Sequence, residues 1–259
     1  MKLQIVPART GVVWVKLGMK TFFKQPLALA GLFFIFTAAM SVLSLIPVLG
    51  NVLALALLPG ATLGLMAATR ETVSGKFPMP TVLLSAFRAG RQQMRSMLIL
   101  GALYAAGFLL VLAISALVDG GKFARLYLLG ASMSAEALQQ GDFELAVLIA
   151  MACYMPLSLL FWHAPALVHW HGISPAKSLF FSFVACLRNF WAMTVYSLVW
   201  MCAFLAMGVV VAVIAALAGN AETVTAIMFP SGMLMAAMFF TSIYFTFQDS
   251  FETEPKGDS

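Results

Sequence analysis

The sequence is poor in charge. Only 10% of its 259 residues are charged, whereas 62% are apolar, and the mean hydropathy is +0.97. A soluble globular domain has about 25% charged and ~45–50% apolar residues. The composition therefore excludes a water-soluble domain and a largely disordered chain, and it indicates a protein that lies within a membrane.

Five long stretches contain no Asp, Glu, Lys or Arg: 25–69, 96–118, 145–176, 189–221 and 223–248. A helix of about 20 apolar residues crosses the bilayer core, so each stretch is long enough to cross, and the first can cross twice around the turn signal at Pro47–Asn51. We therefore predict an all-α integral membrane protein with one membrane domain, 1–248, and an acidic, disordered tail, 249–259. The six predicted spans are 27–46, 51–69, 96–118, 145–170, 190–218 and 224–248.

The first apolar run is 20 residues long and follows 26 residues of more polar sequence. A cleavable signal peptide has a shorter apolar region, about 7–15 residues, after a short basic start. We therefore expect 27–46 to be an uncleaved first span.

The cations are distributed unevenly between the two sides that six spans define. One side holds 13 of the 15 lysines and arginines, and the other holds Lys122 and Arg125, whereas the ten acidic residues divide equally. Cytoplasmic loops carry the excess of Lys and Arg in membrane proteins. The distribution predicts that both termini are cytoplasmic.

Three segments before the odd-numbered spans are predicted to be amphipathic helices: Val12–Lys24, Thr81–Arg95 and Ala176–Asn189. The first two carry basic stripes that we select as candidates for anionic lipid headgroups, because basic residues near the surface attract such headgroups. These candidates are Lys16, Lys20, Lys24, Arg88, Arg91 and Arg95. The third segment has a small polar face made of Ser178, Ser182, Ala185 and Asn189.

The same arrangement suggests a threefold internal repeat of one amphipathic helix, one outward span and one return span. Selection for a basic cytoplasmic side would also place cations before every odd span, so both interpretations stay open. By the second interpretation, the six basic residues only set the topology.

Within the predicted spans, proline is confined to the return spans, which contain Pro59, Pro156, Pro165 and Pro230. Proline kinks a helix, and small residues allow helices to approach closely. Two interpretations follow: plain helix packing, or kinked helices around a cavity. The candidate positions are Pro59, Gly60, Gly64, Pro156, His163, Pro165 and Pro230.

The sequence offers little for catalysis or for metal binding. The spans contain no Asp, Glu, Lys or Arg, and the chain contains no hydrolase, zinc-protease or nucleotide-binding motif, so we expect no enzymatic activity and no catalytic residue. The three cysteines lack a C-x-x-C pattern, and the three histidines do not converge on a helix, so we expect no metal and no cofactor. His163, the ionisable group set inside a span, is either functional or simply hydrogen-bonded.

Several motifs carry a resemblance to a known family: Val6-Pro7-Ala8-Arg9-x-Gly11-x-x-Trp14, Phe22–Leu27, Pro47–Gly50, and Arg70 with Phe77-Pro78-x-Pro80. They resemble an uncharacterised family of betaproteobacterial inner-membrane proteins with six spans. More distantly, the helix-then-span pattern resembles the membrane domain of glycerophosphodiester phosphodiesterases. The first resemblance implies a multi-pass protein of the bacterial inner membrane, and neither implies an activity.

Together these features predict a non-catalytic scaffold, assembly or lipid-interacting module. The expected partners are the lipid bilayer, its anionic lipids and another membrane protein, and nucleic acid is not expected because no basic patch with stacking aromatics occurs. The alternative is a channel or facilitator for a small neutral or amphipathic solute, through a cavity lined by the proline-containing helices.

Overall fold

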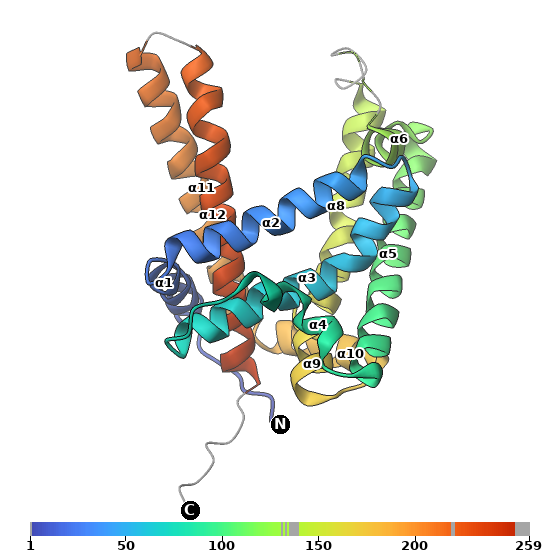
Figure 1. The fold of residues 1–259 in the computed structure, drawn as a ribbon. Helices are drawn as coiled ribbons and strands as arrows, with labels where there is room; N and C mark the ends of the chain where they lie inside the picture. The colour runs from blue at the N-terminus through green and yellow to red at the C-terminus, as the bar shows by residue number, and fades with distance from the viewer. Residues whose placement is uncertain (1, 131, 133, 135–139, 219–220, 252–259) are drawn as a thin grey trace, which may run out of the picture. The chain divides into compact units, whose positions relative to one another are not determined.

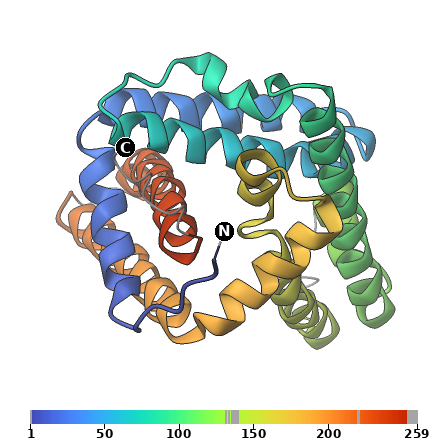
Figure 2. The ribbon, with the colours of Figure 1, turned by 90° about the horizontal axis from the view of Figure 1, so that it is seen from below.

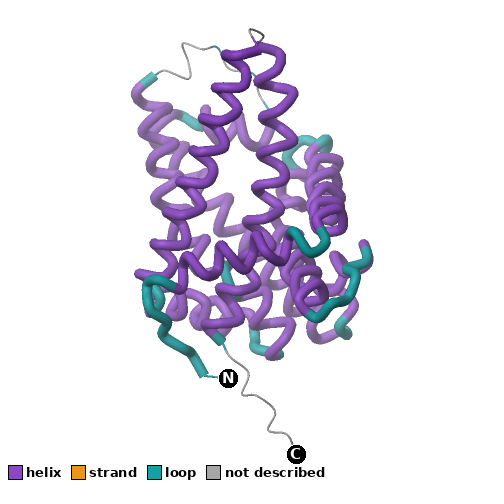
Figure 3. Tube along the Cα trace, turned by 90° about the vertical axis from the view of Figure 1, so that its left-hand side faces the viewer, coloured by secondary structure: helices purple, strands orange, loops and turns teal. Residues whose placement is uncertain are grey.

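The computed structural model describes residues 2–130, 132, 134, 140–218 and 221–251, and every regular element in those residues is helical (Figure 3). The chain is therefore an all-α membrane protein, as predicted. In order, the helices are α1 Thr10–Phe22, α2 Pro26–Ser44, α3 Leu49–Val73, the 3₁₀ helix η1 Pro80–Leu84, α4 Ser85–Arg88, α5 Arg91–Asp119, α6 Lys122–Leu129, α8 Gly141–Phe161, α9 Ala164–His171, α10 Pro175–Arg188, α11 Phe190–Ala218 and α12 Ala221–Ser250 (Figure 1).

Six helical segments in the described residues are long and apolar enough to cross a membrane, and they match the six predicted spans in order. The fourth is interrupted, because α8 ends at Phe161 and α9 begins at Ala164. The sixth continues to Ser250, so Asp249 and Ser250 belong to α12 rather than to the predicted tail. Residues 252–259 of that tail lie outside the described part of the chain.

The second predicted amphipathic helix, Thr81–Arg95, is wrong as a single helix. The segment forms η1 and α4, and then turns at Gly90, whose φ of 114° is costly for any residue with a Cβ. Arg88 therefore lies on α4, whereas Arg91 and Arg95 lie in the first turns of the spanning helix α5. The first and third amphipathic segments form α1 and α10, close to their predicted bounds, and the threefold repeat stays a prediction.

The chain forms two compact units. Unit 1 comprises Met1–Ile35, Gly64–Leu83 and Val184–Ser259, and unit 2 comprises Phe36–Leu63 and Leu84–Phe183. In unit 1, α11 and α12 pack side by side, and α1 packs across both of them (Figure 2). In unit 2, the main packing is between α5 and α8, with α6 against the end of α5 (Figure 1).

Glycine makes the close packing of α1 possible in unit 1. A Cβ on Gly11 would clash with the carbonyl oxygen of Ala192 on α11, and a Cβ on Gly18 would clash with Ser242 on α12. Small residues let helix backbones approach in this way. The two glycines lie on the buried face of α1 together with Trp14, which is fully buried.

Asn189, which follows α10, joins the N-terminal segment to the end of α12. Its Oδ1 accepts a hydrogen bond from the Val6 N–H at 2.8 Å, and its Nδ2 donates to the Gln4 carbonyl at 3.0 Å and to the Ser250 hydroxyl at 3.3 Å. The Gln4 N–H also donates to the Ser250 carbonyl at 3.0 Å. The N-terminal segment and the end of α12 are therefore held together at the same end of unit 1.

We predict that Asn189→Ala destabilises the protein by about 2–3 kcal/mol, because three hydrogen bonds of a buried amide are lost, each worth about 0.5–1.5 kcal/mol. SDS titration of the protein in mixed micelles measures this change, and amide exchange at Gln4 and Val6 should accelerate. Thr194→Ala is the control, because the Thr194 hydroxyl bonds the Phe190 carbonyl of its own helix. Equal stability of the two variants would contradict the role of Asn189.

Candidate functional site

Three of the basic candidates belong to unit 1 and border the buried face of α1. Lys16 and Lys20 lie on α1 and Lys24 follows its end, and all three side chains are exposed. On the buried face of the same helix, Trp14 donates its indole N–H to the Asp249 carboxylate of α12 at 2.8 Å. Because this bond holds α1 against the C-terminal part of α12, the three lysines lie towards the end of unit 1 that contains the N-terminal segment.

The other three basic candidates belong to unit 2. Arg88 ends α4, and Arg91 and Arg95 lie in the first two turns of α5, with all three side chains exposed. None of the six candidates forms an ion pair or a side-chain hydrogen bond with another residue in the described part of the chain. Through these candidates, each unit presents three exposed positive charges that no described residue compensates.

The far end of α5 has a different electrostatic character. Lys122, three residues beyond Asp119, donates to the Asp142 carboxylate at 2.9 Å and to the Gln140 side chain at 2.6 Å. The 29 residues of α5 span about 43 Å at ~1.5 Å per residue, so this compensated lysine and the cluster of arginines lie at opposite ends of one spanning helix. Arg125 of α6 is exposed.

The glycines of the predicted Gly60-x-x-x-Gly64 motif are packing positions. A Cβ on Gly60 would lie 2.8 Å from the ring of Phe87 within unit 2, and a Cβ on Gly64 would lie 2.7 Å from Leu83 within unit 1. These contacts support the packing interpretation of the motif. Among the prolines of the return spans, Pro59 and Pro165 are buried, whereas Pro156 and Pro230 are exposed on α8 and α12.

His163 lies at the break between α8 and α9, where its side chain is fully buried. The Ser182 hydroxyl of α10 accepts a hydrogen bond from the His163 N–H at 2.9 Å and donates to the Leu159 carbonyl at 2.8 Å. These two backbone groups would bond each other in a continuous helix, so Ser182 is inserted into the helical hydrogen-bond ladder. Pro165 contributes as well, because it has no N–H to donate to the Phe161 carbonyl.

No group of three or more His, Cys, Asp or Glu residues in the described chain could hold a metal ion. Of the three cysteines, Cys186 is buried, Cys153 is half-buried and Cys202 is exposed. Burial raises the pKa of the Cys186 thiol to about 12, so this thiol stays protonated at neutral pH.

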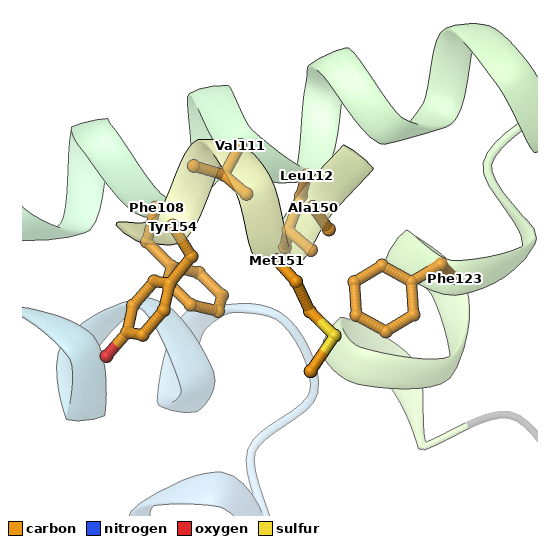
Figure 4. A pocket seen from close by; sticks show the side chains of 7 residues that line it. All are labelled: Phe108, Val111, Leu112, Phe123, Ala150, Met151 and Tyr154. Carbon is orange, nitrogen blue, oxygen red and sulfur yellow. The ribbon is translucent and has the colours of Figure 1, made fainter. Parts of the chain in front are cut away.

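An apolar cavity of about 170 Å³ lies between α5, α6 and α8 of unit 2 (Figure 4). Its lining consists of Phe108, Val111, Leu112, Phe123, Ala150, Met151 and Tyr154. None of the predicted proline, glycine or histidine positions lines this cavity, so it does not correspond to the solute pathway expected from the sequence.

Sequence reasoning misses the roles of two residues and the cavity. The pattern predicts only a small polar face for Ser182 and Asn189, but their partners lie 19 or more residues away. The sequence signal for these hydrogen bonds is the position of Ser182 and Asn189 on one face of an apolar helix. Small polar residues in membrane proteins commonly form hydrogen bonds between helices. No sequence signal identifies the cavity.

The six spans and the wholly helical structure of the described residues define a polytopic membrane protein. The chain is 40% identical to the probable inner membrane protein BTH_II0599 of Burkholderia thailandensis, over 99% of this chain and 96% of that protein. It belongs to the family of that inner-membrane protein, which agrees with the resemblance seen in the sequence. No family model and no solved structure matches the chain, and the likeness to glycerophosphodiester phosphodiesterases stays a prediction.

We predict that Ser182→Ala lowers the free energy of unfolding by about 1–3 kcal/mol, because a buried N–H and a buried carbonyl lose their shared partner. SDS titration in mixed micelles measures the change. Ser178→Ala is the matched control: Ser178 lies one turn away and is equally buried, but its hydroxyl bonds the Pro175 carbonyl of its own helix. If both variants lose the same stability, Ser182 has no special role at the break.

Proposed function

We propose that this chain is a non-catalytic scaffold of the inner membrane that binds anionic phospholipid headgroups on its cytoplasmic side. The observation that carries the proposal is the set of six exposed basic side chains without ion pairs in the described residues. A basic side chain that is paired with a carboxylate within the protein, as Lys122 is with Asp142, attracts an anionic lipid headgroup less strongly.

The two clusters suit a membrane surface. Lys16 and Lys20 lie on a helix whose other face is packed against α11 and α12, so the packing leaves the lysines facing outward. Arg91 and Arg95 start a spanning helix, where an exposed basic side chain reaches the headgroup region. Each basic residue near an anionic surface contributes about 1 kcal/mol to binding.

The orientation of the chain in the membrane is part of the same proposal. In unit 2, Arg88 ends α4, and Arg91 and Arg95 lie at the start of α5. The exposed candidates of unit 1 lie on α1 and directly after it, towards the N-terminal segment. From the positive-inside rule, we infer that the termini face the cytoplasm and that α6 faces the periplasm. A membrane-protein partner for the scaffold stays a prediction.

We predict that neutralising one cluster weakens the retention of anionic lipid. The triple variants are K16Q/K20Q/K24Q and R88Q/R91Q/R95Q, and each should reduce co-purified phosphatidylglycerol and cardiolipin, by roughly fivefold per residue neutralised. Lipid mass spectrometry of the protein in mild detergent provides the measurement.

The matched control exchanges the same positions while keeping the charge, as K16R/K20R/K24R and R88K/R91K/R95K, and it should retain the lipid. Unchanged lipid content in both neutral variants would overturn lipid binding and leave the six residues with a role in topology alone.

We predict that a fluorescent protein fused after Ser259 is fluorescent in cells and that alkaline phosphatase fused at the same position is inactive, because both termini face the cytoplasm. Fusions of the same reporters after Gly130, which follows α6, should give the opposite pair of results. Active phosphatase after Ser259 would contradict the proposed orientation.

A further inference from the structure

The first part of α10, residues 175–183 of unit 2, is amphipathic in the opposite sense to a surface helix of a water-soluble protein. Its hydroxyl-bearing side chains, Ser178 and Ser182, are fully buried, whereas Phe180 and Phe181 are 62% and 37% exposed. At about 100° per residue, Phe180 lies about 160° round the helix from each serine. A helix in water turns its polar face outward. The outer face of this segment therefore suits an apolar medium.

Ser182 places the middle of this segment beside the interior of the fourth span. Its hydroxyl bonds the Leu159 carbonyl and the His163 N–H of that span. Leu159 lies 15 residues beyond Glu144, the last charged residue before it, which is about 22 Å along the helix at ~1.5 Å per residue. Because the hydrocarbon core is about 30 Å thick, Leu159 and Ser182 lie at a depth where lipid surrounds the protein.

The connection between α9 and α10 keeps the start of α10 close to the end of the fourth span. Gly172 ends α9 with a φ of 64°, a left-handed conformation that turns the chain. The next N–H, that of Ile173, donates to the Leu167 carbonyl at 3.3 Å, so the chain folds back over the last turn of α9. Ser174 follows, and α10 begins at Pro175, beside α9 (Figure 1).

A cation lies near the start of the same segment. Lys177 is exposed, lies about 60° round α10 from Phe180, and forms no ion pair with another described residue. It precedes Ser182 by about 8 Å along the helix, towards the end of the fourth span. A lysine at this depth extends its ammonium group to the headgroup region. Its charge therefore complements a lipid phosphate.

We propose that residues 175–183 form a lipid-binding helix at the edge of the hydrocarbon, in which Phe180 and Phe181 contact acyl chains and Lys177 binds a phospholipid phosphate. The site goes beyond the headgroup binding proposed above, because it uses none of the six basic candidates and adds a contact with acyl chains. The triple variants of those candidates leave this site intact, so the failure of either proposal is distinguishable from the failure of the other.

The test places a single spin label at Phe180→Cys or Phe181→Cys in the full chain, in nanodiscs of phosphatidylethanolamine and phosphatidylglycerol. The background carries alanine at Cys153, Cys186 and Cys202. Oxygen concentrates in hydrocarbon, whereas the nickel complex NiEDDA concentrates in water. At both positions, we expect the label to collide with oxygen severalfold more often than with NiEDDA.

Two exposed positions provide the references. Leu148→Cys on the spanning helix α8 represents lipid, and Lys76→Cys, between α3 and η1, represents water. A label at Phe180 that behaves like the one at Lys76 would place the face in water. Few collisions with either reagent would show that protein covers the face. Either result would overturn the proposal.

A second measurement needs no substitution and is used if the cysteine-free chain fails to elute as a single monodisperse species. The unsubstituted chain is illuminated in nanodiscs that contain phosphatidylglycerol with a diazirine in one acyl chain. Peptide mass spectrometry should locate adducts at Phe180 or Phe181. If adducts occur on the exposed face of α8 but not at these two residues, the acyl-chain contact does not exist.

Lys177→Gln tests the phosphate contact in the otherwise unsubstituted chain. It should reduce co-purified phosphatidylglycerol by about fivefold, because one basic residue near the surface is removed. Lys177→Arg is the matched control and should retain the lipid. Equal lipid content in the two variants would contradict the assignment of Lys177 to a phosphate.

Discussion

Hydrocarbon offers no hydrogen-bond partner to a peptide group, and the rest of this structure depends on that constraint. Each N–H and carbonyl within the bilayer must be satisfied by the protein, and the described spanning segments of this chain achieve this as helices. Ions are costly in the same medium, so the charged residues lie outside the central parts of the spans. Helical structure and segregated charge are thus two consequences of one solvent.

Where the helices depart from regularity, short polar side chains satisfy the backbone. Ser182 bridges the break before α9, and the Asp119 carboxylate accepts bonds from the N–H groups of Gly121 and Phe123 where α5 turns into α6. Asn189 likewise satisfies backbone groups of the N-terminal segment, because it bonds the Val6 N–H and the Gln4 carbonyl. These side chains allow the chain to bend without leaving the bonded backbone groups dependent on water.

Polar side chains also form hydrogen bonds between helices of unit 1. The Ser242 hydroxyl lies 2.7 Å from the Tyr196 hydroxyl and accepts a bond from the Trp200 indole N–H at 3.1 Å, and Ser242 is also the residue against which Gly18 packs. Close approach and hydrogen bonding therefore occur at the same point, which favours one packing arrangement over others.

The sequence by itself determined the helical class, the six spans and the separation of cations, because hydropathy and charge act over whole segments and need no knowledge of neighbours. Only the tertiary structure decided that Thr81–Arg95 turns at Gly90, that Ser182 interrupts the fourth span, and that a cavity lies beside Ala150. The last two depend on side chains from segments far apart in the chain. Their meeting is set by packing, which a one-dimensional pattern of apolar residues does not specify.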